Sequence, residues 1–173
     1  EHDEPEIGRV DLAEMLLELR GLGVERPAEF PWLEPPDPAR VALAEGVLLM
    51  LGAIDGSGKL TPLGARMSAL PMHPRLARLL VEAGERGVLE RACRWAAFLG
   101  ERDVIDRRRA RELARRAPES GASDFAALDA AVESAAERGF ASERCRELGI
   151  HAGACREVER TAGLFRRACR DAG

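Results

Sequence analysis

The chain has 173 residues, a formal net charge of −4 at pH 7 and 46% hydrophobic residues. This length suits one domain of ordinary size or two small ones, and the apolar fraction is sufficient for a buried core. No apolar run reaches the roughly 18 residues that a membrane-spanning helix needs, so no membrane partner is expected. Tyrosine is absent and aromatic residues make up only 4%, which favours helices over sheets.

The charge is unevenly distributed along the chain. Residues 1–59 carry thirteen acidic and five basic side chains, whereas residues 60–116 carry seven acidic and thirteen basic ones. The basic middle of the chain allows a phosphate-facing surface that the overall charge does not reveal. Codon usage explains the arginine-rich, lysine-poor composition equally well.

The first part of the chain predicts two helices separated by a proline-rich connector. Apolar residues at helical spacing follow Asp11, a candidate cap, and predict a helix that ends at Gly21. The connector spans residues 24–36. Asp37 then caps a second predicted helix, with Pro38 at its first position.

A turn and a short helix are predicted next. The sequence Asp-Gly-Ser-Gly at 55–58 is a strong turn signal. Short strands near residues 53–54 and 59–60 would make a small hairpin wing. Thr61 is expected to cap a short helix that begins at Pro62.

The remainder of the chain has a wholly helical pattern. Pro71 and Pro74 bracket the junction at which a boundary between two domains is expected. An arginine-rich segment spans residues 102–117, and Asp124 caps a helix beyond it. The last long helix is predicted to run from about residue 153 to residue 170.

The Gly-Ser-Gly-Lys sequence at 56–59 looks like part of a phosphate-binding loop. Five residues separate Gly52 from Gly58, where such a loop requires four. Leu60 follows Lys59 at the place where a magnesium-binding hydroxyl is required. The segment is therefore interpreted as a hairpin turn, and no nucleotide is expected to bind it.

No other group of residues suggests catalysis. The cysteines Cys93, Cys145, Cys155 and Cys169 fall on predicted core faces, and no signal peptide precedes them, so reduced thiols in a cytoplasmic protein are expected. A metal site made of Cys145, His151 and Cys155 would lack both a C-x-x-C pair and a fourth ligand. The carboxylates are interpreted as parts of solvated helix faces. No catalytic residue, metal or cofactor is therefore expected in this chain.

The last helix is the best candidate for contact with nucleic acid. At 100° per residue its apolar residues cluster on one face, and four arginines cluster nearly opposite. A stripe of this kind can follow phosphates, because each neutralised charge releases counterions. A plain solvated face is the alternative, since Glu159 lies beside the stripe. The four arginines are Arg156, Arg160, Arg167 and Arg170.

The arginine-rich segment is a second candidate. Arg107, Arg108 and Arg109 are consecutive, so they point around a helix and do not form one stripe. They either attract nucleic acid through general electrostatics or keep the chain soluble.

Residues 52–80 have the sequence GAIDGSGKLTPLGARMSALPMHPRLARLL. This stretch is similar to the wing and the helix that follows it in the helicase-associated region of DEAH-box RNA helicases, especially the HrpB-like bacterial branch. Residues 5–24 and 30–51 resemble its first two winged-helix helices with the Pro-Pro connector. Residues 123–132, SDFAALDAAV, are similar to a helix of the family's ratchet domain.

The resemblance implies a mainly α-helical fold. It consists of a degenerate winged helix with a small β-hairpin wing over residues 8–71, followed by a ratchet-like helical bundle over residues 72–173. It also implies a non-catalytic accessory fragment of an ATP-dependent RNA helicase. The RecA-like motor domains, which hold ATP and Mg²⁺ in the parent helicase, would precede residue 1. The winged helix would brace these motor domains, and the bundle would form one wall of a channel for single-stranded RNA or other nucleic acid.

The resemblance also concerns individual residues of the last helix. The family's ratchet helix carries an Arg-Ser-Leu-Arg-Arg pattern, and residues 153–157 of this chain stand at the matching place. Arg156 is the one residue there that keeps the arginine character, and Arg160 is its neighbour on the helix.

Two other functions stay open. One is a winged-helix module that binds DNA, although the helix expected over residues 37–51 offers only Arg40 for contact with phosphates or bases. The other is a protein-interaction module, in which the acidic winged helix docks an accessory protein or the motor core.

Overall fold

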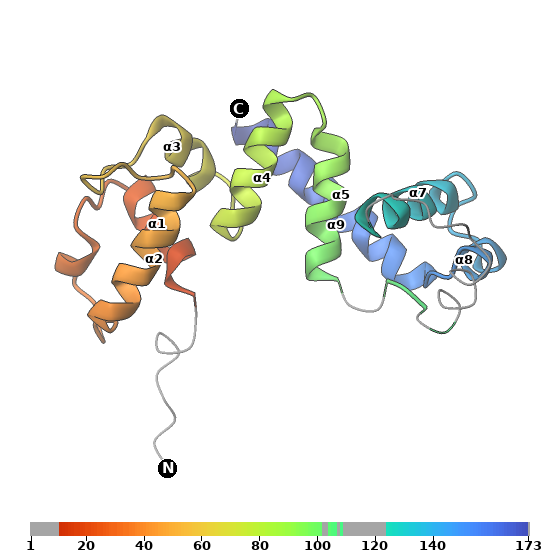
Figure 1. Ribbon diagram of the computed structural model, residues 1–173, viewed down its shortest axis with the longest axis horizontal. Helices are drawn as coiled ribbons and strands as arrows, with labels where there is room; N and C mark the ends of the chain where they lie inside the picture. The colour runs from red at the N-terminus through yellow and green to blue at the C-terminus, as the bar shows by residue number, and fades with distance from the viewer. Residues whose placement is uncertain (1–10, 102–103, 107, 109–123, 173) are drawn as a thin grey trace, which may run out of the picture. The chain divides into compact units, whose positions relative to one another are not determined.

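The fold is mainly helical in the part of the chain that the structure describes (Figure 1). This part contains no β-sheet, and the prediction of a mainly α-helical chain is therefore confirmed. None of its helices is long and apolar enough to cross a membrane. The computed structural model describes residues 11–101, 104–106, 108 and 124–172.

The chain separates into two compact units. Unit 1 holds the described residues of 1–86 and 168–173, and unit 2 holds those of 87–167. The last helix contributes residues to both units. The predicted division into domains over 8–71 and 72–173 stays a prediction.

Unit 1 is built from short helices that begin at local capping signals. Asp11, Asp37 and Thr61 each accept a hydrogen bond from a backbone N–H two or three residues further on, as predicted. Leu16 and Leu48 are fully buried where α1 packs on α2. The described elements of unit 1 are α1 (Leu12–Gly21), η2 (Pro27–Glu29), α2 (Pro38–Met50), α3 (Pro62–Ser68) and α4 (Pro74–Glu85).

Asp11 and His73 link the first residues of α1 and α4. The Nδ1 atom of His73 accepts a hydrogen bond from the N–H of Arg75 at 3.2 Å and so caps α4. Because Nδ1 is the acceptor, the hydrogen lies on Nε2, which donates to Asp11 Oδ2 at 3.0 Å. The hydrogen bond from His73, and then that from the N–H of Ala13, lowers the pKa of Asp11.

Replacing Asp11 with asparagine is expected to destabilise unit 1 more at neutral pH than in acid. The pKa of Asp11 in the folded state lies below its ordinary value of 3.8. The ionised carboxylate therefore stabilises the fold above that value, and its contribution is lost as the pH falls through the folded-state pKa. Asparagine also caps helices, so the variant isolates the contact with His73.

The size of this effect is limited, because 54% of the Asp11 side chain is exposed. We expect a difference in unfolding free energy of less than about 1 kcal/mol at neutral pH. Urea unfolding of both proteins at about pH 6 and about pH 2.5 measures it, since a larger fraction of the carboxylate is protonated at the lower pH. A difference of the same size at both pH values would contradict the role given to the ionised carboxylate.

The predicted β-hairpin wing is not seen. Between α2 and α3 the described chain makes a tight turn with one isolated antiparallel bridge, from Ile54 to Leu60. The carboxylate of Asp55 closes the turn, because it accepts hydrogen bonds from the N–H groups of Ser57 and Lys59 at 2.8 and 3.0 Å. The hydroxyl of Ser57 contributes most to the lowered pKa of Asp55. These bonds also occupy amides that a phosphate loop would offer to a nucleotide.

Thr61 leads the chain from this turn into α3. Its hydroxyl donates to the carbonyl of Gly52 at 2.6 Å and accepts from the N–H of Gly64 at 2.9 Å. Its own N–H donates to the carbonyl of Ala53 at 3.0 Å. Because Thr61 is the N-cap of α3, the chain enters the helix at Pro62, so no further bridge follows the one at Leu60 and a two-stranded wing does not form.

Unit 2 consists mainly of helices in its described part. Trp95 and Phe98 of α5 lie near Phe125 of α7, with ring centroids 5.9 and 6.4 Å apart. Outside the helices, an isolated antiparallel bridge joins Ile105 to Ile150, just before α9. The helices are α5 (Leu89–Gly100), α7 (Asp124–Ala136), α8 (Ser142–Leu148) and α9 (Ala152–Ala172), of which α9 extends beyond unit 2.

Candidate nucleic-acid interface

Helix α9 has a buried face and an exposed face, in the phase that helical spacing predicts. Cys155, Val158 and Ala162 are 0% exposed. The other side of the helix carries three predicted site residues, Arg156, Arg160 and Arg167, which are exposed. Successive members are four and seven residues apart, so they follow one line along the helix. These three residues are called the arginine stripe.

The three arginines differ in what holds their guanidinium groups. Arg156 donates from Nη2 to the carbonyl of Phe140 at 3.1 Å. Arg160 donates from Nε to Glu157 Oε2 at 2.9 Å. Arg167 forms no hydrogen bond or ion pair with another described residue. An exposed ion pair contributes at most about 1 kcal/mol, so a phosphate can replace Glu157 at little cost.

Arg166 is adjacent to the stripe in sequence but has different surroundings. Its side chain is only 22% exposed, and Nη1 lies 2.7 Å from Glu90 Oε2. Its Nη2 lies 3.8 Å from Glu159 Oε2. Arg166 was not predicted as a site residue. The seven-residue spacing of Glu159 and Arg166 was the available signal, since it places both on one side of the helix.

The consecutive arginines are only partly described. Arg107 and Arg109 lie outside the described residues. Arg108 is exposed, and its N–H donates to Asp106 Oδ1 at 3.1 Å. The N–H of Asp106 donates in turn to the carbonyl of Gly149 at 2.9 Å. These bonds place Asp106 and Arg108 close to the beginning of α9, so Arg108 and the helix of the arginine stripe, which were predicted as separate candidates, are neighbours in unit 2.

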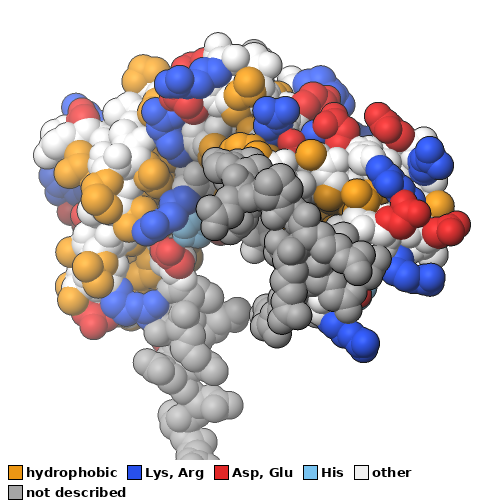
Figure 2. Space-filling model, turned by 45° about the vertical axis from the view of Figure 1, so that its right-hand side comes forward, with side chains coloured by type: hydrophobic (Ala, Val, Ile, Leu, Met, Phe, Trp, Pro, Cys, Tyr) orange, Lys and Arg blue, Asp and Glu red, His pale blue; other side chains and the backbone are white. Residues whose placement is uncertain are grey.

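The charge on the molecular surface is mixed. On the face drawn in Figure 2, acidic and basic side chains lie next to one another over the described residues. The arginine stripe shows the same mixture, since Glu157 pairs with Arg160. The stripe is therefore a narrow line of cations with acidic neighbours. An arrangement of this kind can contact a single phosphate chain and is less suited to a broad duplex surface.

The cysteines occupy structural positions. Cys93, Cys145 and Cys155 are buried and Cys169 is half-buried, and none of the four is in a disulfide. Burial raises the pKa of Cys155 to about 11, which keeps this thiol protonated and unreactive at neutral pH. His151 is exposed. Among the residues that the structure describes, no group of three or more His, Cys, Asp or Glu side chains could hold a metal ion.

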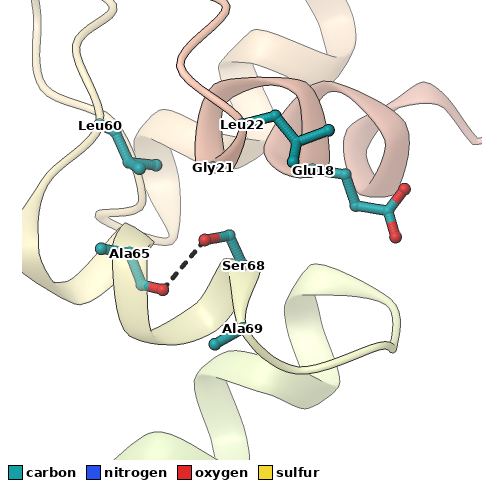
Figure 3. Close-up of a pocket in the computed structure, with 7 residues that line it drawn as sticks. All are labelled: Glu18, Gly21, Leu22, Leu60, Ala65, Ser68 and Ala69. Carbon is teal, nitrogen blue, oxygen red and sulfur yellow. Dashed lines mark hydrogen bonds between the residues drawn. The ribbon is translucent and has the colours of Figure 1, made fainter. Parts of the chain in front are cut away.

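Unit 1 contains an apolar pocket of about 580 Å³ between the end of α1 and α3 (Figure 3). The hydroxyl of Ser68 donates to the carbonyl of Ala65 at 2.9 Å, so its hydrogen is already used. The carboxylate of Glu18 points away from both residues. The pocket offers an apolar contact surface and no pair of groups for acid–base chemistry. Its lining residues are Glu18, Gly21, Leu22, Leu60, Ala65, Ser68 and Ala69.

The segment from the second half of α2 to the residues before α4 matches a known family. The model for the helicase associated domain (HA2), winged-helix, matches residues 44–72. In the structure these residues form the end of α2, the tight turn and α3. The match confirms the resemblance of this chain to the helicase-associated region of DEAH-box RNA helicases.

The relatives are helicases of much greater length. The chain is 38% identical over 112 residues to the ATP-dependent RNA helicase HrpA of Escherichia coli (strain K12), covering 62% of this chain and 9% of that protein. It is 40% identical over 98 residues to HrpB of the same organism, covering 57% and 12%. It is 33% identical over 102 residues to the probable ATP-dependent RNA helicase DHX35 of Homo sapiens, covering 58% and 14%. The identity to HrpB is compatible with the predicted HrpB-like branch.

Proposed function

We propose that the chain is a non-catalytic accessory part of an ATP-dependent RNA helicase and that its arginine stripe contacts single-stranded RNA in the cytoplasm. The stripe is the observation that carries the proposal, because three exposed arginines on one line can follow successive phosphates. The relatives HrpA and HrpB are named ATP-dependent RNA helicases. ATP and Mg²⁺ would be bound by RecA-like motor domains of the whole protein.

The outer face of α2 supports a bracing role for unit 1. Leu43, Leu49 and Met50 are 73%, 50% and 78% exposed. Burying such side chains contributes about 25 cal/mol per Å² of apolar surface. We propose that unit 1 packs this apolar face against the motor domains of the same protein. Packing against the motor domains is also the protein-interaction function that these exposed side chains support best.

The same face of α2 makes a DNA-reading winged helix the weaker candidate. A recognition helix needs polar side chains that form hydrogen bonds with base edges. Arg40 and Glu45 are the only charged residues between the first and last residues of α2, and Glu45 already pairs with Arg20.

RNA binding tests the proposal directly. The double variant Arg156→Ala/Arg160→Ala is expected to bind unstructured single-stranded RNA roughly tenfold more weakly than the wild type at low salt. Each lost phosphate contact should also reduce the salt dependence of the affinity by a slope of about 1. Fluorescence anisotropy with a labelled oligouridine, at low and moderate salt, measures both quantities.

A matched control separates a specific stripe from general charge. Arg26→Ala/Arg138→Ala removes two exposed arginines from elsewhere on the chain, and therefore changes the net charge by the same amount. We expect this control to retain most of the wild-type affinity. Equal losses in the two double variants would show that RNA responds to net charge only. No binding by the wild type at low salt would reject the RNA-contact role of this chain.

A further inference from the structure

An ion network joins α5, α7 and α9 within unit 2. Its centre is Asp129 of α7, which is 2% exposed. Arg94 Nε lies 2.6 Å from Asp129 Oδ1, and Arg91 Nε lies 3.1 Å from Oδ2. A buried carboxylate is costly unless it is paired, so these two arginines of α5 hold α7 in place. The interhelix ion network consists of Glu90, Arg91, Arg94, Asp129, Glu133, Glu159 and Arg166.

Helix α9 joins this network through two residues. Glu159 Oε1 lies 4.0 Å from Arg94 Nε, and Glu159 Oε2 lies 3.8 Å from Arg166 Nη2. Arg166 Nη1 lies 2.7 Å from Glu90 Oε2. The side chains of Arg94, Glu159 and Arg166 are 13%, 25% and 22% exposed, whereas that of Glu90 is 72% exposed. Salt therefore screens the pair of Arg94 and Glu159 less than it screens the pair of Arg166 and Glu90. The two points of attachment therefore tie α9 to α5 over two helical turns.

These attachments act together with the buried face of Cys155, Val158 and Ala162 to restrain the rotation of α9 about its own axis. Glu159 and Arg166 are seven residues apart, so they lie on nearly one line along the helix. At about 100° per residue, the arginine stripe lies about a quarter of the circumference away from that line. Any rotation that separated Arg166 from Glu90, or Glu159 from Arg94, would turn the arginine stripe by the same angle.

We propose that Glu90, acting through Arg166, and Glu159, acting through Arg94, are positioning residues that hold α9 in the rotation at which its arginine stripe faces a single-stranded RNA. This inference rests on the proposed RNA contact. Arg166 itself does not bind phosphate in this arrangement, because two carboxylates already surround its guanidinium group.

The direction in which one double substitution changes the RNA affinity distinguishes a positioning role from simple electrostatic repulsion. Neutralising an acid next to an RNA-binding surface reduces repulsion of phosphates and should therefore raise the affinity. If Glu90 and Glu159 position the helix, their neutralisation releases α9 from α5 and lowers the affinity instead. Glu90→Gln/Glu159→Gln keeps the size of both side chains and removes two negative charges.

The experiment uses the whole chain and a labelled oligouridine in fluorescence anisotropy. We expect Glu90→Gln/Glu159→Gln to bind about three- to tenfold more weakly than the wild type. The matched control is Glu143→Gln/Glu157→Gln, which removes the same charge from exposed positions and frees Arg160. It should bind as tightly as the wild type or more tightly. Affinity of the Glu90→Gln/Glu159→Gln variant equal to or above that of the wild type would overturn the proposal.

Hydrogen exchange gives a second readout that does not depend on RNA. Release of α9 should speed amide exchange across Glu159–Arg166 in the Glu90→Gln/Glu159→Gln variant and leave it unchanged in the control. Unchanged exchange in this variant would overturn the positioning role. If circular dichroism shows that the double variant loses helix, Glu159→Gln alone is compared in the same way. Absence of RNA binding by the wild type would reject the proposed RNA contact, whereas the exchange result would still decide whether the network holds α9.

Discussion

Replacing Gly64 with alanine is expected to lower the unfolding free energy of unit 1 by about 3 kcal/mol or more. A Cβ atom at this position would lie 1.9 Å from the carbonyl oxygen of Ala53 and 2.8 Å from Leu60 Cδ1. The backbone of Ala53 cannot move aside as a flexible side chain would. The same oxygen accepts a hydrogen bond from the N–H of Thr61 at 3.0 Å. Displacing α3 from Ala53 would therefore break this hydrogen bond as well.

The matched control for this prediction is Gly46→Ala in the middle of α2. A Cβ atom at Gly46 meets nothing within 4 Å, and alanine is favoured over glycine in a helix by about 1 kcal/mol. We expect this control to be as stable as the wild type or more stable. Urea unfolding followed by Trp32 fluorescence, in a Trp95→Phe background, reports on unit 1. Similar stability of the two alanine variants would contradict the close packing of α3 on Ala53.

Replacing Glu45 with alanine is expected to lower the unfolding free energy of unit 1 by about 2 to 4 kcal/mol. The Arg20 side chain is only 4% exposed, and its Nη2 donates to Glu45 Oε1. Its Nε and Nη1 atoms are buried without a hydrogen-bond partner among the described residues. Loss of Glu45 would leave the buried guanidinium group without its acceptor. The cost lies toward the lower end for buried pairs, because 39% of the Glu45 side chain is exposed.

Two further variants make this prediction decisive. Glu29→Ala removes the surface pair between Glu29 and Arg26, whose side chains are 65% and 76% exposed, respectively. This variant should lose less than about 1 kcal/mol of unfolding free energy. Arg20→Met/Glu45→Met removes both charges and should recover much of the lost stability. Equal effects of Glu45→Ala and Glu29→Ala on the urea midpoint would show that Arg20 does not depend on its partner.

Local sequence signals correctly predicted how the helices of unit 1 begin. Asp11, Asp37 and Thr61 cap helices as expected. These signals are reliable because a cap involves only the next two or three residues of the chain. The wing was predicted wrongly, although its turn was recognised. Whether the turn continues into paired strands depended on Asp55 and Thr61, whose side chains bind the local backbone and end the pairing after one bridge.

The interpretation of carboxylates as solvated side chains is wrong for Asp129. Its helix, α7, has a mixed pattern, and its burial depends on Arg91 and Arg94 of another helix. The pair of Glu90 and Arg166 spans 76 residues of sequence. Periodicity along one helix contains no information about which helix packs against it, so the sequence could not predict these partners.

The sequence by itself determined the helical class of the chain, the capped starts of its first helices, the exposed line of arginines on α9 and the resemblance to a helicase-associated region. These properties depend on composition, on near neighbours and on a period of 3.6 residues. Only the tertiary structure decided which charged side chains form ion pairs with other helices and which are available to a ligand. Arg166 is held by α5 while its neighbour Arg167 is exposed. The reason is that ion pairing depends on the distance between side chains of different helices, and folding alone sets that distance.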